Sequence, residues 1–474
     1  MTLPVGFRLR VDERTRRHDD GRLLIGGAPR RVLRLTDRGA ATARLLLDGQ
    51  PVTGNGDAAL ARRLLDTGIA QPVPVVSALT VEVVIPVYDD TSALDRCLAS
   101  LGTDVGVTVV DDGSAAADAV AAVAARHHAT LVRQPHNRGP AAARNAGAGR
   151  CASDVIAFVD SDAVVDAMTL RRVAAHFSDP LVTAVAPRVQ SLDTVRGVLG
   201  AVARHWSPLD LGPTAGRVVA AGRVAYVPST VLLVRRDAFT AVSGFDESLR
   251  YGEDVDLVWR LGAAGGVVRY EPTSVARHAE PTTWSAWLRR RFAYGTAAAP
   301  LAERHGDSAA PLVIAPAPLA AVGLAVAGAP LGGAVVAAVT AWRLQRRLRA
   351  AHVPSADAAS AALVAPVQTA LGAARWLTQL WWPTLLLAAS RSRRSRAVVS
   401  VAILAPPLVE WAKRRPPLDP LRWTAAVVVD DVGYGLGVWA GSIRGRTWRA
   451  LLPRLRVPRR DTPTTSAGNA DPRR

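Results

Sequence analysis

The sequence predicts an α/β fold in which a core domain is flanked by a small winged-helix-like domain and by a C-terminal helical, membrane-associated region. Three observations support this prediction. Short apolar runs between residues 80 and 306 are followed by acidic or turn-forming residues, residues 1–75 carry strand and then helix signals, and residues 308–450 are largely apolar. Apolar strands that end in polar residues are typical of open α/β sheets, which bind ligands at the carboxyl ends of their strands.

Composition and charge indicate the surroundings of the protein. The chain has 474 residues and a formal net charge of +18, and residues 391–474 contain 17 basic and 6 acidic residues. A basic tail among apolar segments favours anionic lipid head groups as partners and argues against nucleic acid. Cys97 and Cys151, the two cysteines, exclude a disulfide framework and fit a reducing cytoplasm. The first dozen residues lack the apolar core of a signal peptide.

Residues 1–75 are expected to form a domain of their own. Residues 21–36 predict two strands around a Gly-Gly-Ala-Pro turn, and residues 36–49 and 55–68 each combine a polar cap, a helical pattern and a terminal glycine. A Gln-Pro-Val-Pro linker follows at residues 71–74. The segment resembles the peptide-binding chaperone domains of the pyrroloquinoline-quinone type, which serve the maturation of ribosomally made peptides. The alternative is a generic cap on the core domain.

The first two strands of the core domain are expected to bring polar residues to one edge of the sheet. Val81–Val87 is a β-branched run that suits a buried parallel strand, and Pro86 near its end forces the loop outward. Val107–Val110 leads into Asp111 and Asp112, at a turn where a carboxylate could accept a hydrogen bond from a nucleobase or ribose. An ordinary structural turn is the alternative.

A second turn precedes a candidate phosphate-binding helix. Asn137 and Gly139 belong to an Asn-Arg-Gly-Pro turn, and the alanine-rich stretch after it favours a helix that carries Arg144. The first turn of a helix together with an arginine suits an anionic phosphate. The alternative is a solvated helix face capped by Asn137.

Asp160 and Asp162 are candidate ligands of a divalent cation. They follow the continuous apolar strand Val155–Val159, and two carboxylates one residue apart at a strand end can bind one hard cation and the phosphate oxygens that it bridges. His278 follows a later strand-like segment and is a candidate third ligand, with a structural histidine as the alternative. An isolated Asp-x-Asp is usually a turn, but here it follows two strand ends with ligand-type residues, which favours the cation site.

Glu253 and Asp254 begin a predicted helix whose apolar residues share one side. Acidic residues in a first helical turn are ordinarily explained by the helix dipole. A carboxylate is also the simplest general base for an attacking hydroxyl, so both residues are candidates for catalysis.

In order and spacing these five motifs resemble the nucleotide-sugar glycosyltransferases of family 2, which have a GT-A fold; the resemblance covers residues 80–300. It implies a UDP-sugar donor, Mg²⁺ or Mn²⁺ on its diphosphate, and inversion at the anomeric carbon. By position, Asp111 would contact the uracil and Asp254 would be the catalytic base, with Glu253 beside it contacting the acceptor. The resemblance places Pro86, Tyr88, Asp111, Asp112, Asn137, Gly139, Arg144, Asp160 and Arg291 in the donor site, and Asp160, Asp162 and His278 at the metal.

The sequence departs from the processive members of this family at one element. Those synthases carry a Q-x-x-R-W element on the acceptor side, whereas this chain has WSAWLRRRFAYG at residues 284–295. Because the Q-x-x-R-W element is missing, the sequence argues against processive polymerisation. Arg289, Arg290 and Arg291 could still bind the diphosphate.

Residues 308–450 are expected to form helices that associate with a membrane, and residues 451–474 a disordered basic tail. Ser308–Trp342 contains no charged residue and suits one tilted span or, broken at residues 328–333, a re-entrant hairpin. Later apolar segments lie at residues 358–390, 397–409 and 423–443, the last interrupted by Asp430 and Asp431. Because every connection is basic, the positive-inside rule favours hairpins or interfacial helices over single spans. An alanine-rich soluble helical domain is the alternative.

The three parts together resemble the glycosyltransferases of the mycofactocin system. This resemblance implies transfer of β-linked glucose from UDP-glucose to a redox cofactor derived from a ribosomal peptide, by an enzyme at the cytoplasmic membrane with its catalytic domain facing the cytoplasm. The alternatives are a family 2 transferase for a lipid-linked or cell-envelope glycan and a non-catalytic membrane scaffold that binds a peptide precursor. Asp162 and Asp254 together argue against the scaffold, and the absence of a G-x-G-x-x-G after the first strand argues against a dehydrogenase.

Overall fold

The computed structural model describes residues 2–28, 30–75, 78–220, 222–350 and 353–455. Contacts divide the chain into two compact units, one with residues 1–310 and 374–451 and the other with residues 311–373 and the chain from 452 onward. The helices after residue 374 therefore belong with the core domain. This division differs from the single helical region that we expected over residues 308–450.

Residues 1–75, which we call the N-terminal domain, contain the two strands and two helices that the sequence predicts, and contacts place them in the same unit as the core domain. They are β3 (Leu23–Gly26), β4 (Arg31–Arg34), α1 (Asp37–Leu47) and α2 (Asn55–Asp66). Three unpredicted strands complete it: β2 (Arg16–His18) extends the β3–β4 hairpin, and β1 (Arg8–Val11) pairs antiparallel with β5 (Ala70–Val73). Buried leucines such as Leu9, Leu24 and Leu64 form its core.

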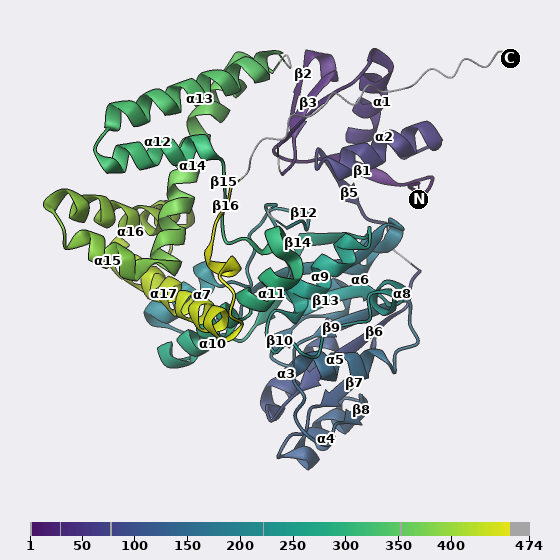
Figure 1. The fold of residues 1–474 in the computed structure, drawn as a ribbon. Helices are drawn as coiled ribbons and strands as arrows, with labels where there is room; N and C mark the ends of the chain where they lie inside the picture. The colour runs from purple at the N-terminus through teal and green to yellow at the C-terminus, as the bar shows by residue number, and fades with distance from the viewer. Residues whose placement is uncertain (1, 29, 76–77, 221, 351–352, 456–474) are drawn as a thin grey trace. The chain divides into compact units, whose positions relative to one another are not determined.

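The core domain is built on a nine-stranded mixed sheet with the strand order β10-β14-β11-β13-β9-β6-β7-β8, and β12 pairs with β14 (Figure 1). The strands β6, β7, β8 and β9 run parallel, as their β-branched sequences predict, whereas β13 is antiparallel to both β9 and β11. In chain order the strands are β6 (Val81–Val87), β7 (Gly106–Asp111), β8 (Thr130–Arg133), β9 (Val155–Val159), β10 (Ala163–Val164), β11 (Val182–Ser191), β12 (Gly216–Arg217), β13 (Val231–Arg235) and β14 (Val267–His278).

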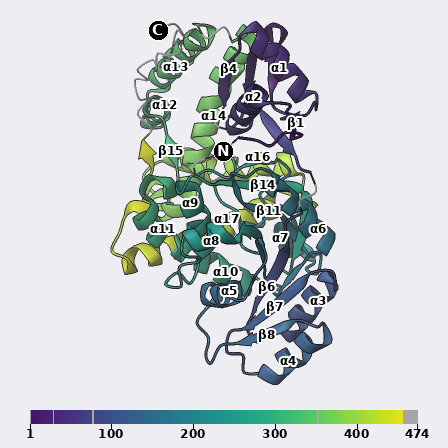
Figure 2. The same cartoon turned by 90° about the vertical axis from the view of Figure 1, so that its right-hand side faces the viewer.

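Helices cover both faces of this sheet, because successive side chains of a strand point to opposite faces. Ile85 and its neighbours pack against α3 (Thr91–Leu101), α4 (Ala117–Arg126) and α6 (Ala167–Ala174). On the other face, Val84 and Phe158 pack against α5 (Pro140–Ala148), α8 (Arg236–Ala241) and α9 (Glu253–Ala263). Figure 2 shows β6, β7 and β8 with α3 and α5 on opposite sides of them.

The carboxyl ends of the strands bring the predicted polar residues to one edge of the sheet. Strand β6 pairs in parallel with both β7 and β9, so Asp111 at the end of β7 and Asp160 just after β9 lie at the same edge. Antiparallel pairing of Ala163 with His278 then brings the end of β14 to the residues that follow β9.

The C-terminal helices of this unit pack on helices of the core domain. Helix α17 (Pro420–Arg444) lies along α10 (Trp284–Thr296) and against α7 (Gly197–Trp206), around the buried indoles of Trp206, Trp287 and Trp423 (Figures 1 and 2). The segment 423–443, which we expected at a membrane, thus packs one side against the core domain, whereas Val429, Leu436 and Ile443 of the same helix are exposed. Helices α11 (Ala298–His305), α15 (Trp382–Ala389), α16 (Arg393–Arg414) and the end of α14 (Ser355–Leu380) complete this part.

Helices α10 and α17 touch backbone to backbone. A Cβ atom on Gly437 would lie 2.0 Å from the carbonyl oxygen of Phe292, and one on Gly295 would lie 2.2 Å from that of Tyr434. Glycine at these positions therefore sets how closely the two helices approach.

The second unit is a helical hairpin joined to a short strand pair. Helices α12 (Pro316–Ala327) and α13 (Pro330–Ala350) are separated at residues 328–329, within the break that the sequence predicts. Strand β15 (Val313–Ile314) pairs in parallel with β16 (Arg454–Leu455). The hairpin exposes apolar side chains, among them Leu331 and Val335. Of the predicted tail, residues 451–474, the structure describes residues 451–455, which contain β16, and residues 456–474 lie outside the described residues.

The helix contact gives a stability prediction. Replacing Gly437 by alanine forces a methyl group into the Phe292 carbonyl, so we expect the free energy of unfolding to fall by about 1–3 kcal/mol, as in overpacked cores. The matched control is Gly262→Ala in the exposed last turn of α9, where a Cβ meets nothing within 4 Å. There we expect a gain of about 0.5–1 kcal/mol from helix propensity. Chemical denaturation of both variants checks this, and equal effects would contradict the close contact.

Candidate active site

Asp160, Asp162 and His278 form an acidic trio at the carboxyl edge of the sheet. One potential ligand atom from each residue lies within 4.8 Å of the other two, and His278 Nε2 is 3.2 Å from Asp162 Oδ2. The histidine is buried and both carboxylates are half-buried. Burial raises the pKa of Asp162, but His278 and Arg290 outweigh it and hold that pKa below its ordinary value.

The trio has the chemistry of a divalent metal site. Two carboxylates and one imidazole suit Mn²⁺ or Mg²⁺, and three ligands from the described residues leave coordination positions for phosphate oxygens. The pKa of His278 is lowered by burial and raised more strongly by Asp162, so it lies above its ordinary value. A proton therefore competes with a cation at His278, whereas the ligand set of two carboxylates and one imidazole fits the predicted cation.

Arg144 connects this trio to the predicted catalytic pair. Its two terminal nitrogens donate to Asp160 Oδ1 at 2.6 Å and to Glu253 Oε1 at 2.8 Å, and only 4% of the residue is exposed. Burial opposes its charge, but the two carboxylates raise the pKa of Arg144 above its ordinary value. Because its charge is already paired, Arg144 orients Asp160 and Glu253 here, whereas the sequence suggested a nucleotide contact.

Glu253 and Asp254 occupy the first turn of α9, as predicted, but their surroundings differ. Glu253 is buried against Arg144, whereas Asp254 is half-buried and accepts a hydrogen bond from the Ser229 backbone amide at 3.1 Å. Burial, with the neighbouring Asp254 carboxylate, raises the pKa of Glu253 to about 7. Burial also raises the pKa of Asp254, and the Asp160 charge acts in the same direction. The second carboxylate is thus the more accessible of the two.

The turns after β7 are fixed by two buried aspartates. Asp112 accepts hydrogen bonds from the backbone amides of Arg138 and Gly139, both at 2.8 Å, and so holds the predicted phosphate turn at the start of α5. Gly139 has a φ of +94°, which disfavours any residue with a side chain. Asp111 is fully buried, accepts from the Ser114 amide at 2.9 Å and lies 3.3 Å from Arg133. Both carboxylates therefore fix backbone turns at the edge of the site.

The remaining predicted donor-site residues lie around these turns. Tyr88, directly after β6, is 52% exposed, and Pro86 is half-buried in that strand. The side-chain oxygen of Asn137 lies 3.5 Å from a terminal nitrogen of Arg250.

Two neighbouring arginines of α10 face different surroundings. Arg291 donates to Asp430 at 2.7 Å and is buried in the protein interior, so it is not exposed to a donor as the sequence suggested. Arg290 instead pairs with Glu280 at 3.3 Å, its side chain is 24% exposed, and its charge acts on both Asp162 and His278. Trp287, Arg291 and Gly295 follow one another at four-residue spacing on the buried side of α10. This spacing in the sequence would have distinguished the buried Arg291 from the more exposed Arg290.

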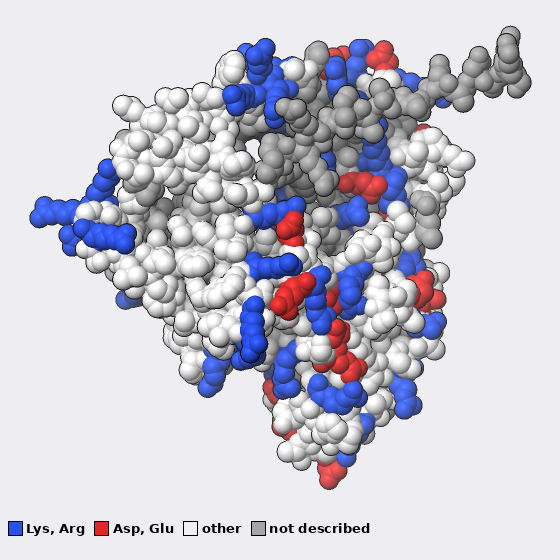
Figure 3. All heavy atoms as spheres, in the orientation of Figure 1, with Lys and Arg blue, Asp and Glu red and all other residues white. Residues whose placement is uncertain are grey.

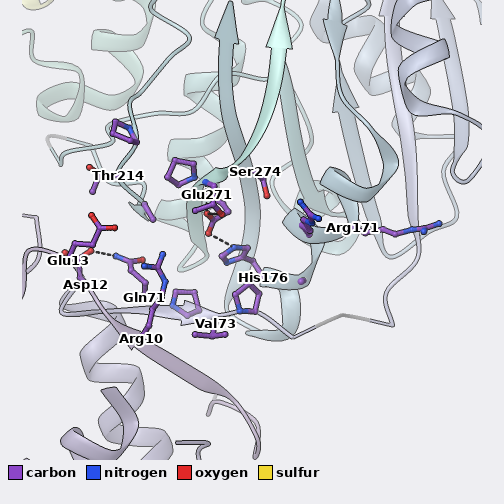
Figure 4. A pocket seen from close by; sticks show the side chains of 18 of the residues that line it. Arg10, Asp12, Glu13, Gln71, Val73, Arg171, His176, Thr214, Glu271 and Ser274 are labelled. Atoms are coloured by element: carbon purple, nitrogen blue, oxygen red, sulfur yellow. Dashed lines mark hydrogen bonds and ion pairs between the residues drawn. The ribbon is translucent and has the colours of Figure 1, made fainter. Parts of the chain in front are cut away.

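A large cavity lies apart from the acidic trio. It has a volume of about 830 Å³ and is lined by the N-terminal domain, by residues around α6, and by the middle of β14 (Figure 4). His176 and Glu271, 3.0 Å apart, face it from the sheet domain, and Gln71 bonded to Asp12 faces it from the N-terminal domain. No pattern in the sequence predicted this cavity.

The chain is similar to several known glycosyltransferases. The model of the family described as Glycosyl transferase family 2 matches residues 82–241. Over 469 residues the chain is 40% identical to the pre-mycofactocin glycosyltransferase of Mycobacterium tuberculosis, a match that covers 96% of this chain and 99% of that protein. The succinoglycan biosynthesis protein ExoO of Rhizobium meliloti is 33% identical over 196 residues, which is 38% of this chain and 54% of that protein.

Among solved structures, a mannosyltransferase of Pyrobaculum calidifontis in complex with GDP-Man and Mn²⁺ is 19% identical, with a TM-score of 0.43, over 76% of this chain and 89% of its own. The match to the Mycobacterium tuberculosis protein extends over almost the full length of both chains, and the family model covers the strands whose ends carry the carboxylates of the site. The chain therefore belongs to the pre-mycofactocin glycosyltransferases of glycosyl transferase family 2.

Proposed function

We propose that the chain transfers glucose from UDP-glucose to a precursor of mycofactocin, a redox cofactor derived from a ribosomal peptide, and inverts the anomeric carbon to give a β-linkage. The observation that supports the proposal is the Arg144 bridge, which links Asp160 of the trio to Glu253, the neighbour of the candidate base Asp254. Donor activation and acceptor deprotonation need these two groups side by side.

Residues of the trio and of α10 would serve the leaving diphosphate. Asp160, Asp162 and His278 would hold Mg²⁺ or Mn²⁺, which when bound neutralises charge on the diphosphate. Arg290 adds a partly exposed cation beside them. Asp112 keeps the turn before α5 in place. The backbone of this turn and Asn137 would then line the part of the site that holds the nucleotide.

Asp254 would accept the proton of the acceptor hydroxyl. The Ser229 amide fixes its carboxylate, and the raised pKa of Asp254 makes it a stronger base than an exposed aspartate. Attack from the base side, with the diphosphate leaving on the side of the trio, is an in-line displacement that inverts the anomeric carbon. Glu253, held by Arg144, would contact the acceptor next to this base.

The N-terminal domain would bind the peptide-derived part of the acceptor. The relative from Mycobacterium tuberculosis is named for a pre-mycofactocin substrate and matches this chain over 96% of its length, which includes this domain. The cavity between this domain and β14 has charged and apolar walls, including Arg10, Glu13 and Val73, which suit a peptide-derived molecule (Figure 4).

Helices α15 and α16 would attach the enzyme to the cytoplasmic membrane. Among the helices of the described residues, α16 alone is long and apolar enough to cross a membrane, with a mean hydropathy of 1.2 and 17% of its apolar stretch buried. Four arginines between residues 391 and 396 are exposed beside exposed leucines and valines, and Figure 3 shows such arginines next to a wide uncharged surface. This combination suits helices that lie in the interface of an anionic membrane.

The metal proposal is tested by Asp162→Ala. Calorimetry with UDP should show that Mn²⁺ strengthens UDP binding to the wild-type protein. In the variant, the affinity for UDP in the presence of Mn²⁺ should be about 10- to 100-fold lower, a loss that is known even for residues that only support metal ligands. Asp104→Ala, which removes a carboxylate whose side chain is 68% exposed, is the control and should bind like the wild type. Equal metal dependence in all three proteins would contradict the site.

The base is tested by Asp254→Asn. Transfer of glucose from UDP-glucose to the peptide-derived precursor should fall by about 10²–10⁴-fold, with donor affinity nearly unchanged because the substitution preserves shape. A base works only when ionised, and the pKa of Asp254 is raised, so wild-type activity should decline with falling pH at a value above that of an exposed aspartate. This decline should vanish in Asp254→Asn and persist in the milder Glu253→Gln. Wild-type turnover in Asp254→Asn would reject this residue as the base.

Membrane attachment is tested by replacing Leu386, Leu387, Val401 and Leu404 together by serine. All four are exposed, from 44% to 67%. We expect the wild-type protein to sediment with anionic vesicles and to stay bound in high salt, because salt screens the arginines but not apolar insertion. The serine variant should be released by salt. Complete release of the wild-type protein by the same wash would reject insertion.

A further inference from the structure

We infer that α17 is a working part of the donor site and that Asp430, on this helix, is a positioning residue that acts through Arg290. The inference rests on the proposed function in one respect, since it takes the group beside Arg290 to be a nucleotide diphosphate.

Asp430 is a buried carboxylate on which three other side chains converge. It is 1% exposed and accepts hydrogen bonds from Arg291 Nε at 2.7 Å, from Trp287 Nε1 at 2.8 Å and from Trp206 Nε1 at 3.2 Å. The first two donors belong to α10 and the third to the last residue of α7. One carboxylate of α17 therefore fixes two helices at once.

The residues next to these donors reach the acidic trio. Ser207, which follows Trp206, donates to Glu280 Oε1 at 2.7 Å, and Arg290, which precedes Arg291, donates to Glu280 Oε2 at 3.3 Å. Glu280 is 5% exposed and stands two residues after His278. A closed series of contacts thus runs from Asp430 through α7 and α10 to Glu280 and the end of β14.

This arrangement determines where the Arg290 guanidinium lies. Its neighbour Arg291 is fixed by Asp430 and stacks on Tyr434, with its guanidinium 5.1 Å from the ring centroid. The backbone contacts of Gly295 and Gly437 prevent α10 from moving closer to α17. Arg290 is consequently held on the other side of α10, where its charge acts on Asp162 and His278.

Asp431 offers a matched comparison within the same helix turn. It is also buried, at 4% exposed, but its partners are Arg375 at 3.3 Å and Gln379 at 3.0 Å on α14. Arg375 reaches the series only by stacking on the ring of Trp206, 4.6 Å from its centroid, and not through a hydrogen bond of α10. Losing either carboxylate leaves an arginine without its counter-charge and should lower stability. Only the loss of Asp430 should displace Arg290, so the two positions separate a packing role from a positioning role.

The test is a double-mutant cycle on the full chain, followed by nucleoside diphosphate release. We expect Asp430→Asn and Arg290→Gln each to lower kcat by about 10- to 100-fold, as for a misplaced catalytic contact. In the Arg290→Gln background, Asp430→Asn should lower it by less than about twofold, because both changes remove the same interaction. Asp431→Asn should lower the melting temperature and leave kcat within about twofold of the wild type.

Independent, multiplicative losses in the cycle, or an equal loss of kcat in Asp431→Asn, would overturn the inference. Where Asp430→Asn does not fold, Trp287→Phe removes one donor, keeps the ion pair and takes its place in the cycle. Each comparison uses whichever of UDP-glucose and GDP-mannose the wild-type enzyme turns over faster. A failure of the proposed donor then appears as a wild-type preference for GDP-mannose, and a failure of this inference appears as absent coupling.

Discussion

The buried guanidinium of Arg144 is the interaction on which the catalytic centre depends. Asp160, Asp162, Glu253 and Asp254 would repel one another at the edge of the sheet, and Arg144 is the cation that joins two of them directly. A buried cation that bridges two carboxylates is costly to disrupt, since removing it leaves negative charge without compensation in a poorly solvated place. The same bond ties the end of β9 to the start of α9, two segments that are far apart in the sequence.

The sequence predicted the elements that a local pattern specifies. β-Branched runs predicted the parallel strands. The residues that follow these runs, Asp111, Asp160 and Asp162, predicted at which edge of the sheet the site lies. What it could not give are the partners of each charge, because these come from distant segments: Arg144 meets Glu253, and Arg291 meets Asp430. A charged residue near a site and a charged residue buried in a structural ion pair have the same sequence appearance.

The C-terminal helices show a related limit of hydropathy. An apolar segment suits the interior of a protein as well as the interior of a membrane, and residues 423–443 belong to the first kind. Their distinguishing feature is the pair Asp430 and Asp431, two buried carboxylates that each pair with an arginine. Charged residues of this kind are rare in transmembrane segments. By contrast, Leu386 and Leu387 of α15 and Leu331 and Val335 of the α12–α13 hairpin are exposed.

The short strand pair β15–β16 has a consequence for how the protein is made. Its two members stand at residues 313–314 and 454–455, so the whole run from α12 to α17 is enclosed between them. During synthesis the first strand emerges long before the second, and contacts between remote segments form slowly because a long loop must close first. The second unit therefore completes this strand pairing only after β16 has been synthesised. Folding of this unit is thereby coupled to the synthesis of the helices that separate its two strands.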